Sequence, residues 1–202
     1  MAKLTEGQRA ERAAKRRFRE ALEAEDRAIR ERERDARWER EDTRLTWEEV
    51  QQGISCRGCG KTIMDGLGEF PPRMHETPEQ TAAREADEAA YRERHSGCKA
   101  HRWSVQGSRT IHCGWCCPPP PFNPAKAAEL AQLIRNLSRH PALEHEYVTW
   151  RLSLTCGHVA DKRARQSNHT YSSSTLDCAE CGAVRGIVDK MQLPRSGVAV
   201  RH

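Results

Sequence analysis

The sequence has few of the residues that build a large apolar core. Of its 202 residues, only 5% are aromatic and 37% are hydrophobic, and the chain contains just three Phe. Its mean hydropathy is −0.87. The length leaves room for one domain or for two small ones. Because so little apolar surface can be buried, we expect a second source of stability beside hydrophobic packing.

Long apolar runs are missing as well. The first residues do not resemble a signal peptide, and no stretch of ~20 apolar residues could cross a membrane. We therefore expect a cytoplasmic protein without membrane contact. Disulfides rarely persist in a reducing compartment, so clustered cysteines there point to metal binding. The odd total of nine cysteines agrees with this, because ligation needs no even number.

The C-terminal part carries the sharper metal-binding pattern. Cys156-Gly157-His158 and the pair Cys178 and Cys181 stand about twenty residues apart. Three thiolates and one imidazole make a closed structural zinc site. Residues 147–156 alternate between apolar and polar side chains, which predicts a half-buried strand that leads into the first two ligands.

These motifs resemble a zinc ribbon over about residues 145–192. Cys178-Ala-Glu-Cys181-Gly matches the usual second knuckle, whereas Cys156-Gly-His158 replaces the usual Cys-x-x-Cys. The resemblance implies two hairpins joined by one Zn²⁺, and a role in nucleic-acid transactions or in docking. If His158 points away, His169 is the substitute ligand.

The upstream set has more candidates than one ion can use. They are Cys56, Cys59, His95, Cys98, His101, His112, Cys113, Cys116 and Cys117. One pairing joins the two knuckles and gives Cys56, Cys59, Cys113 and Cys116. Another follows chain order and gives Cys56, Cys59, His95 and Cys98, with the remaining candidates building a second site. The predicted helix end favours the second pairing slightly, because it brings His95 and Cys98 together. We expect two or three Zn²⁺ ions in total.

Three helices are predicted. Residues 1–50 are rich in Arg, Glu and Ala and predict a charged helical arm, either solvated or used to bind a protein or nucleic acid. Residues 77–95 form a helix inserted in the central zinc module, with Thr77 and Gln80 as a capping box. Residues 123–141 form a linker helix whose apolar stripe is predicted to be a packing face. This stripe consists of Leu130, Leu133, Ile134 and Leu137.

The predicted architecture is an α+β protein of small zinc-stapled modules. After the arm come a central Cys/His module at 53–122, the linker helix, and a C-terminal zinc ribbon at 142–202. The chain has a formal net charge of +5. Lys162, Arg163 and Arg165 are expected in an exposed loop at the far end of the ribbon, where cations suit phosphate contact.

The predicted function is non-enzymatic: a zinc-binding protein that contacts DNA or RNA or acts as a regulatory accessory protein. A protein-docking adaptor is the alternative. A zinc-dependent nuclease is less expected, because it needs an open metal position or clustered carboxylates, and acids are sparse after residue 95. A deaminase is not supported, since its His-x-Glu and Pro-Cys-x-x-Cys motifs are missing.

Overall fold

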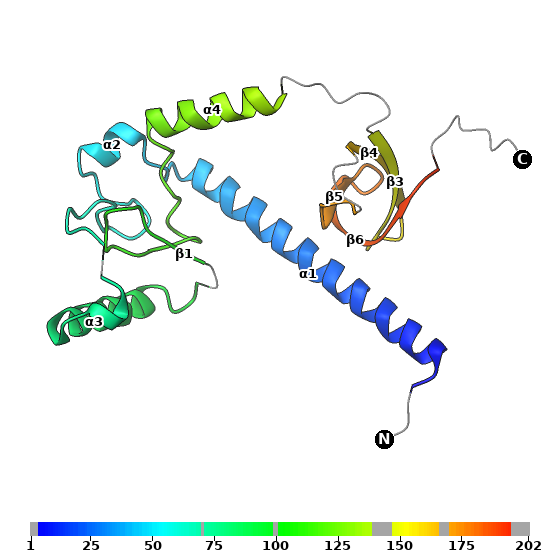
Figure 1. The fold of residues 1–202 in the computed structure, drawn as a ribbon, viewed down its shortest axis with the longest axis horizontal. Helices are drawn as coiled ribbons and strands as arrows, with labels where there is room; N and C mark the ends of the chain where they lie inside the picture. The colour runs from blue at the N-terminus through cyan, green and yellow to red at the C-terminus, as the bar shows by residue number, and fades with distance from the viewer. Residues whose placement is uncertain (1–3, 70, 99–100, 139–146, 166–169, 195–202) are drawn as a thin grey trace, which may run out of the picture. The chain divides into compact units, whose positions relative to one another are not determined.

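A computed structural model describes residues 4–69, 71–98, 101–138, 147–165 and 170–194. The chain divides into two compact units. Met1–Arg32 with Leu137–His202 forms the first unit, and Glu33–Asn136 forms the second. Helices and small antiparallel sheets occur together, which confirms the α+β class (Figure 1).

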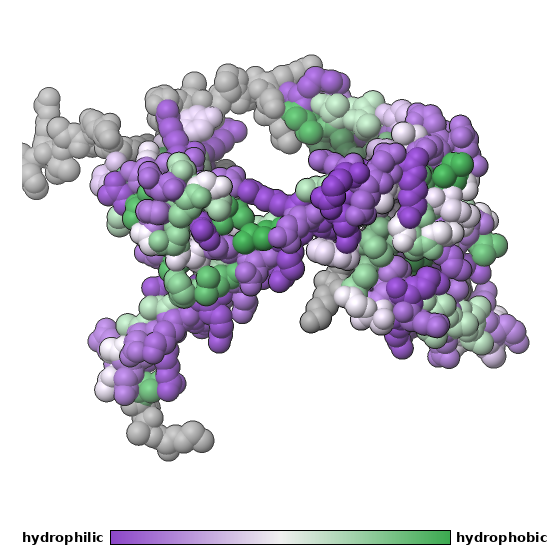
Figure 2. Space-filling view, turned by 180° about the vertical axis from the view of Figure 1, so that it is seen from behind, coloured by the Kyte–Doolittle hydropathy of each residue, from purple (hydrophilic) through white to green (hydrophobic). Residues whose placement is uncertain are grey.

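Helix α1, Glu6–Arg40, is the long charged helix that the sequence predicts, but it ends ten residues early. Its surface is largely hydrophilic (Figure 2), and Glu11 pairs with Lys15 at 2.7 Å. Two positions on it, Ala21 and Ala24, are buried. The helix is therefore not solvated throughout, because part of it packs within the first unit.

The first unit is built on a four-stranded antiparallel sheet in the order β4-β3-β6-β5. Its strands are β3 (Tyr147–Leu154), β4 (Val159–Arg165), β5 (Thr175–Cys178) and β6 (Ala183–Gln192). The alternation predicted for residues 147–156 is confirmed, since β3 buries every second side chain. The core of this unit consists of Val148, Trp150, Leu152, Leu154, Cys178 and Ile187.

Helix α1 packs closely on strand β6 at Gly186. A Cβ atom at Gly186 would lie 2.0 Å from the Ala21 carbonyl oxygen, so only glycine fits there. The Glu25 carboxylate accepts hydrogen bonds from the Gly186 amide at 2.9 Å and from Arg185 Nη1 at 2.7 Å. It also accepts one from the Thr155 hydroxyl. These contacts tie the helix to the residues that flank the C-terminal ligands.

The second unit has helices but very little strand. Beyond the end of α1 it contains α2 (Trp47–Gln51), a 3-10 turn (Arg73–His75), α3 (Pro78–Arg94), β1 (Arg102–Trp103), β2 (His112–Cys113) and most of α4 (Pro124–Ser138). Its core consists of Leu45, Val50, Cys56, Ile63, Tyr91, Cys113 and Cys117. Trp38 is buried, and its Nε1 donates to the Trp115 carbonyl at 3.0 Å. The end of α1 and the residues that follow it therefore pack within this unit.

Two predicted helix starts are confirmed. Thr77 and Gln80 form the capping box of α3, and Asn123 caps α4 by accepting the Lys126 amide at 2.8 Å. The packing expected along α4 is contradicted at two positions, however. Leu133 is 53% and Ile134 61% exposed, while Leu130 is half-buried, and hydrophobic residues show along this helix in Figure 2. The sequence showed the apolar stripe but not whether anything covers it.

Among the described residues, no helix has both the length and the apolar composition that crossing a lipid bilayer would need.

Candidate metal centres

Cysteine and histidine side chains gather in three groups of four. Within each group all ligand atoms lie within 4.8 Å of one another. The first cluster is Cys56, Cys59, His112 and Cys117, the second is His95, Cys98, Cys113 and Cys116, and the third is Cys156, His158, Cys178 and Cys181. All nine cysteines lie in the described part of the chain and are free of disulfides. The protein therefore has three sets of side chains that could each hold a metal ion.

The third cluster unites the four C-terminal residues that the sequence suggested. His158 Nδ1 lies 3.4 Å from Cys156 Sγ, 3.5 Å from Cys178 Sγ and 3.3 Å from Cys181 Sγ. Two tight turns bring these side chains together. The Gly157 amide donates to the Leu154 carbonyl and the Gly182 amide to the Cys178 carbonyl, both at 2.9 Å.

Glycine is needed in both of these turns. The φ angle is +84° at Gly157 and +63° at Gly182, a region that residues with a Cβ atom rarely adopt. The ribbon-like motifs therefore contain both the candidate ligands and the two glycines that their turns need. His169, the substitute ligand, lies outside the described residues.

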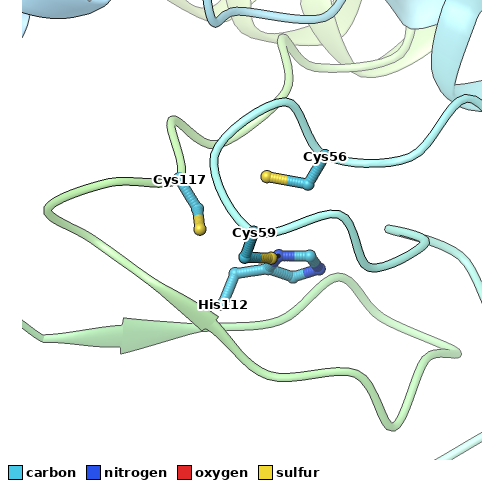
Figure 3. Close-up of side chains that lie close together, drawn as sticks. All are labelled: Cys56, Cys59, His112 and Cys117. Atoms are coloured by element: carbon cyan, nitrogen blue, oxygen red, sulfur yellow. Dashed lines mark hydrogen bonds between the residues drawn. The ribbon is translucent and has the colours of Figure 1, made fainter. Parts of the chain in front are cut away.

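The first cluster joins two distant segments (Figure 3). Cys56 and Cys59 come from a turn in which the Gly60 amide donates to the Cys56 carbonyl at 2.7 Å. His112 lies on β2 and Cys117 follows it, and all four side chains point toward one another in Figure 3. The Cys59 Sγ and His112 Nδ1 atoms are 3.4 Å apart.

The second cluster begins at the end of α3. His95 is the C-cap of this helix, and the Cys98 amide donates to the His95 carbonyl at 2.9 Å. The helix end thus delivers both residues together, as the sequence predicts. Cys113 and Cys116 complete the set, with Cys116 Sγ 3.3 Å from His95 Nδ1. The Trp115 amide donates to Cys113 Sγ at 3.4 Å, a contact that stabilises a thiolate.

Both pairings considered from the sequence are wrong. The knuckle at Cys56 and Cys59 meets His112 and Cys117, while His95 and Cys98 meet Cys113 and Cys116. His112 and Cys113 are consecutive residues on β2, and successive side chains on a strand point to opposite faces. One residue therefore enters each cluster. The alternation of side chains along a strand could have predicted from the sequence that His112 and Cys113 enter different clusters. No local feature of the sequence distinguishes Cys117 as a member of the first cluster.

His101, another upstream candidate, belongs to none of the three clusters. Its carbonyl accepts the Gly114 amide at 2.8 Å. A Cβ atom at Gly114 would lie 2.8 Å from the His101 ring. His101 thus supports the turn between the ligands Cys113 and Cys116.

The distances fit a tetrahedral ion with sulfur and nitrogen ligands. Zinc bonds of ~2.3 Å to sulfur and ~2.0 Å to nitrogen give tetrahedral edges of about 3.8 Å between sulfurs and about 3.5 Å between sulfur and nitrogen. The measured sulfur to nitrogen distances are 3.3 to 3.5 Å. Cys156 Sγ and Cys178 Sγ are 3.9 Å apart. The residues present therefore fit such an ion.

Electrostatics inside the first cluster also favours a cation. Hydrogen bonds from Cys117 and Cys59 lower the pKa of Cys56, whereas hydrogen bonds with Cys56 and Cys59 raise the pKa of Cys117. Burial would lower the pKa of His112, but hydrogen bonds with Cys56 and Cys59 raise it to about 9. Neighbouring thiols cannot all ionise without compensating positive charge. A divalent cation at the centre would allow every sulfur to be a thiolate.

The three basic residues are not placed as predicted. Lys162, Arg163 and Arg165 lie on strand β4 instead of in a loop, because residues 159–165 pair with β3 over their whole length. All three side chains are exposed. Arg163 lies over the Tyr147 ring at 4.9 Å. The loop that follows, residues 166–169, is outside the described residues.

The three sets of side chains are compatible with a metal-binding protein. Comparisons with protein-family models, with curated proteins and with solved structures find no match for this chain.

Proposed function

We propose that this chain is a non-enzymatic zinc protein whose three ions hold its two small units folded. The observation that carries the proposal is the composition of the clusters, each with three sulfurs and one imidazole nitrogen. Soft thiolate ligands in a tetrahedral set favour zinc over magnesium or calcium, which prefer oxygen.

The donor sets support a structural role for the ions. A catalytic zinc site keeps one position open for water or substrate, whereas a structural site uses four protein ligands. Each of the three clusters supplies four. Each ion is then available to stabilise the fold, a contribution on the order of 10 kcal/mol of binding free energy.

Elemental analysis of the purified chain tests this proposal. We expect three zinc ions per chain, and two after Cys181→Ser. The matched control is His75→Ala, which changes an exposed histidine of the 3-10 turn outside all three clusters and should leave three ions. A chain that contained iron, or no metal while remaining folded, would contradict the proposal.

We further propose that the first unit contacts nucleic acid through one face of strands β3 and β4. The strand register places Tyr147 opposite Arg165, Thr149 opposite Arg163, and Arg151 opposite Asp161. Three arginines and one aromatic ring therefore share a face. Arginine suits phosphate contact, and a half-buried ring such as Tyr147 can stack on a base if Arg163 moves off it. Asp161 reduces the positive charge of this face, because it forms an ion pair with Arg151 at 2.9 Å.

The same register separates Lys162 from the two arginines. Lys162 stands opposite Trp150, on the other face of the sheet. This provides a matched pair of variants for a salt titration of binding to single-stranded DNA or RNA. Arg163→Ala with Arg165→Ala should weaken binding and reduce the slope of log K against log salt by about 1.4. Lys162→Ala should leave both unchanged.

A protein-docking role is the other candidate, and the exposed Leu133 and Ile134 on α4 favour it. It predicts that no nucleic acid binds even at low salt. It also predicts that the arginine variants behave like the unmodified chain. Binding that falls equally in the arginine and lysine variants would contradict the proposed face and leave only a general effect of charge.

A further inference from the structure

The first and second clusters are in direct contact. Cys116 Sγ belongs to the second cluster and Cys117 Sγ to the first, yet these two atoms are only 3.7 Å apart. A single tetrahedral zinc site has sulfur to sulfur edges of about 3.8 Å. The separation between the two donor sets is therefore no larger than the separation of sulfurs within one set.

One short segment contributes residues to both clusters. Residues 112–117 supply four ligands, and the outer two, His112 and Cys117, belong to the first cluster. The inner two, Cys113 and Cys116, belong to the second. The turn is closed by the Cys117 amide, which donates to the Cys113 carbonyl at 2.9 Å. Fixing the two ends of this segment therefore also fixes its middle.

The knuckle of the first cluster packs against the same segment. A Cβ atom at Gly58 would lie 1.8 Å from the Cys116 carbonyl oxygen, so the two backbones touch at a position where only glycine fits. Cys56, Cys113 and Cys117, which come from both donor sets, lie in one buried core. Displacing one set would therefore disturb the other.

Given the proposed zinc function, we propose that the first and second clusters form one dinuclear centre that takes up its two ions cooperatively. An ion in the first cluster holds His112 and Cys117, and so orders Cys113 and Cys116 between them. The second ion then needs to capture only His95 and Cys98, which the end of α3 already presents together. Most of the entropy of closing the chain is lost when the first ion binds, so the second binds more tightly.

Zinc titration followed by native mass spectrometry tests the pairing. The full chain carrying Cys178→Ser and Cys181→Ser, which removes the third cluster, is reduced, freed of metal and titrated with Zn²⁺. Two equal independent sites place about half of the molecules in the one-ion state at half saturation, whereas a coupling of about 100-fold lowers that fraction to about a tenth. We expect the smaller fraction, with chains carrying either no ion or two.

A second measurement uses the unmodified chain and does not depend on the variant folding. Three-ion protein is treated with increasing chelator, and the third cluster, whose His158 is exposed, should release its ion first. We expect the three-ion, two-ion and metal-free species, with little of the one-ion species. One-ion chains as abundant as independent release predicts would overturn the dinuclear centre and leave the zinc function intact. A chain that never binds zinc would overturn both.

Discussion

The two units place their candidate metal ligands differently. In the second unit, three of the seven residues of the buried core are candidate ligands, Cys56, Cys113 and Cys117. In the first unit only one of six, Cys178, is a candidate ligand, and the other five are apolar side chains on strands β3 and β6. The first unit thus has a hydrophobic core with a metal cluster beside it. In the second unit the clusters are part of the core.

The candidate ligands of the two units also differ in how deeply they are buried. His112, Cys113 and Cys117 are 0% exposed, whereas Cys156 and Cys181 are half-buried and His158 is exposed. Regular structure differs too, because the first unit has a four-stranded sheet and the second a sheet of two-residue strands. Under the proposed zinc function, a unit with so few hydrogen-bonded strands would depend on its ions to order the chain.

Removing the metal should have the largest effect and should separate the two units. With chelator under reducing conditions, we expect the second unit to unfold, because it loses two ions and with them the order of its core. The first unit should keep β3 and β6 paired around Leu152. Hydrogen exchange measured by mass spectrometry checks this, with protection lost over residues 45–117 and retained in β3. Equal loss in both units would remove the distinction.

Single ligand substitutions should give the next largest effect. Cys117→Ser removes a fully buried ligand and leaves a polar group inside a core, whereas Cys181→Ser changes a half-buried ligand. We expect the first variant to lower the melting temperature more and to reduce soluble yield. Thermal unfolding of both zinc-loaded variants provides the measurement. A larger loss for Cys181→Ser would show that the exposed cluster is the stronger support.

The sequence predicts well what is decided locally. The capping box of α3, the start of α4 and the alternation of β3 each depend on residues close in the chain, and all three are confirmed. The turn glycines of the third cluster belong to the same class. Its candidate ligands lie on two hairpins, β3 with β4 and β5 with β6, and the pairing of β3 with β6 joins these hairpins in one sheet. The ribbon-like spacing was enough to predict the set of four residues, although this last pairing is nonlocal.

The features that the sequence does not predict are nonlocal. Pairing of the upstream ligands depends on how residues 112–117 meet two separate segments, and both orders are compatible with the spacing. The β4 strand looks like a loop because its polar composition has no alternation, and only pairing with β3 makes it a strand. The exposure of Leu133 on α4 depends on whether a neighbouring surface exists.

In the second unit, the backbone at Gly58 lies close to the backbone at Cys116. Gly58→Ala should destabilise the second unit by about 1–3 kcal/mol, because the new Cβ atom meets a backbone carbonyl that cannot turn away. Gly97→Ala is the matched control, since no atom lies within 4 Å of its Cβ position and its φ angle is not positive. Denaturant unfolding of the zinc-loaded variants checks the difference. Equal effects would mean that the contact between the first and second clusters carries little energy.

The smallest expected effect concerns the first unit, where Glu25 provides a support for α1 that needs no metal. Burial would raise the pKa of Glu25, but hydrogen bonds from Thr155, Gly186 and Arg185 outweigh it and lower the pKa. A carboxyl group whose pKa is lowered by folding stabilises the fold above its unfolded pKa, and this contribution is lost as pH falls through the folded pKa.

Glu25→Gln keeps the shape but removes the charge, so we expect a loss of about 1 kcal/mol near neutral pH, the difference between a charged and a neutral hydrogen bond. The loss should shrink as the medium becomes acidic, because the carboxyl group of the unmodified chain then becomes neutral as well. Glu20→Gln, at an exposed position on the same helix, is the control. Unfolding measured between pH 7 and pH 3 on chains with Cys178→Ser and Cys181→Ser isolates this effect from metal release in the third cluster. A Glu25 effect that grew in acid would contradict the proposed support, because protonation abolishes the charge on which it depends.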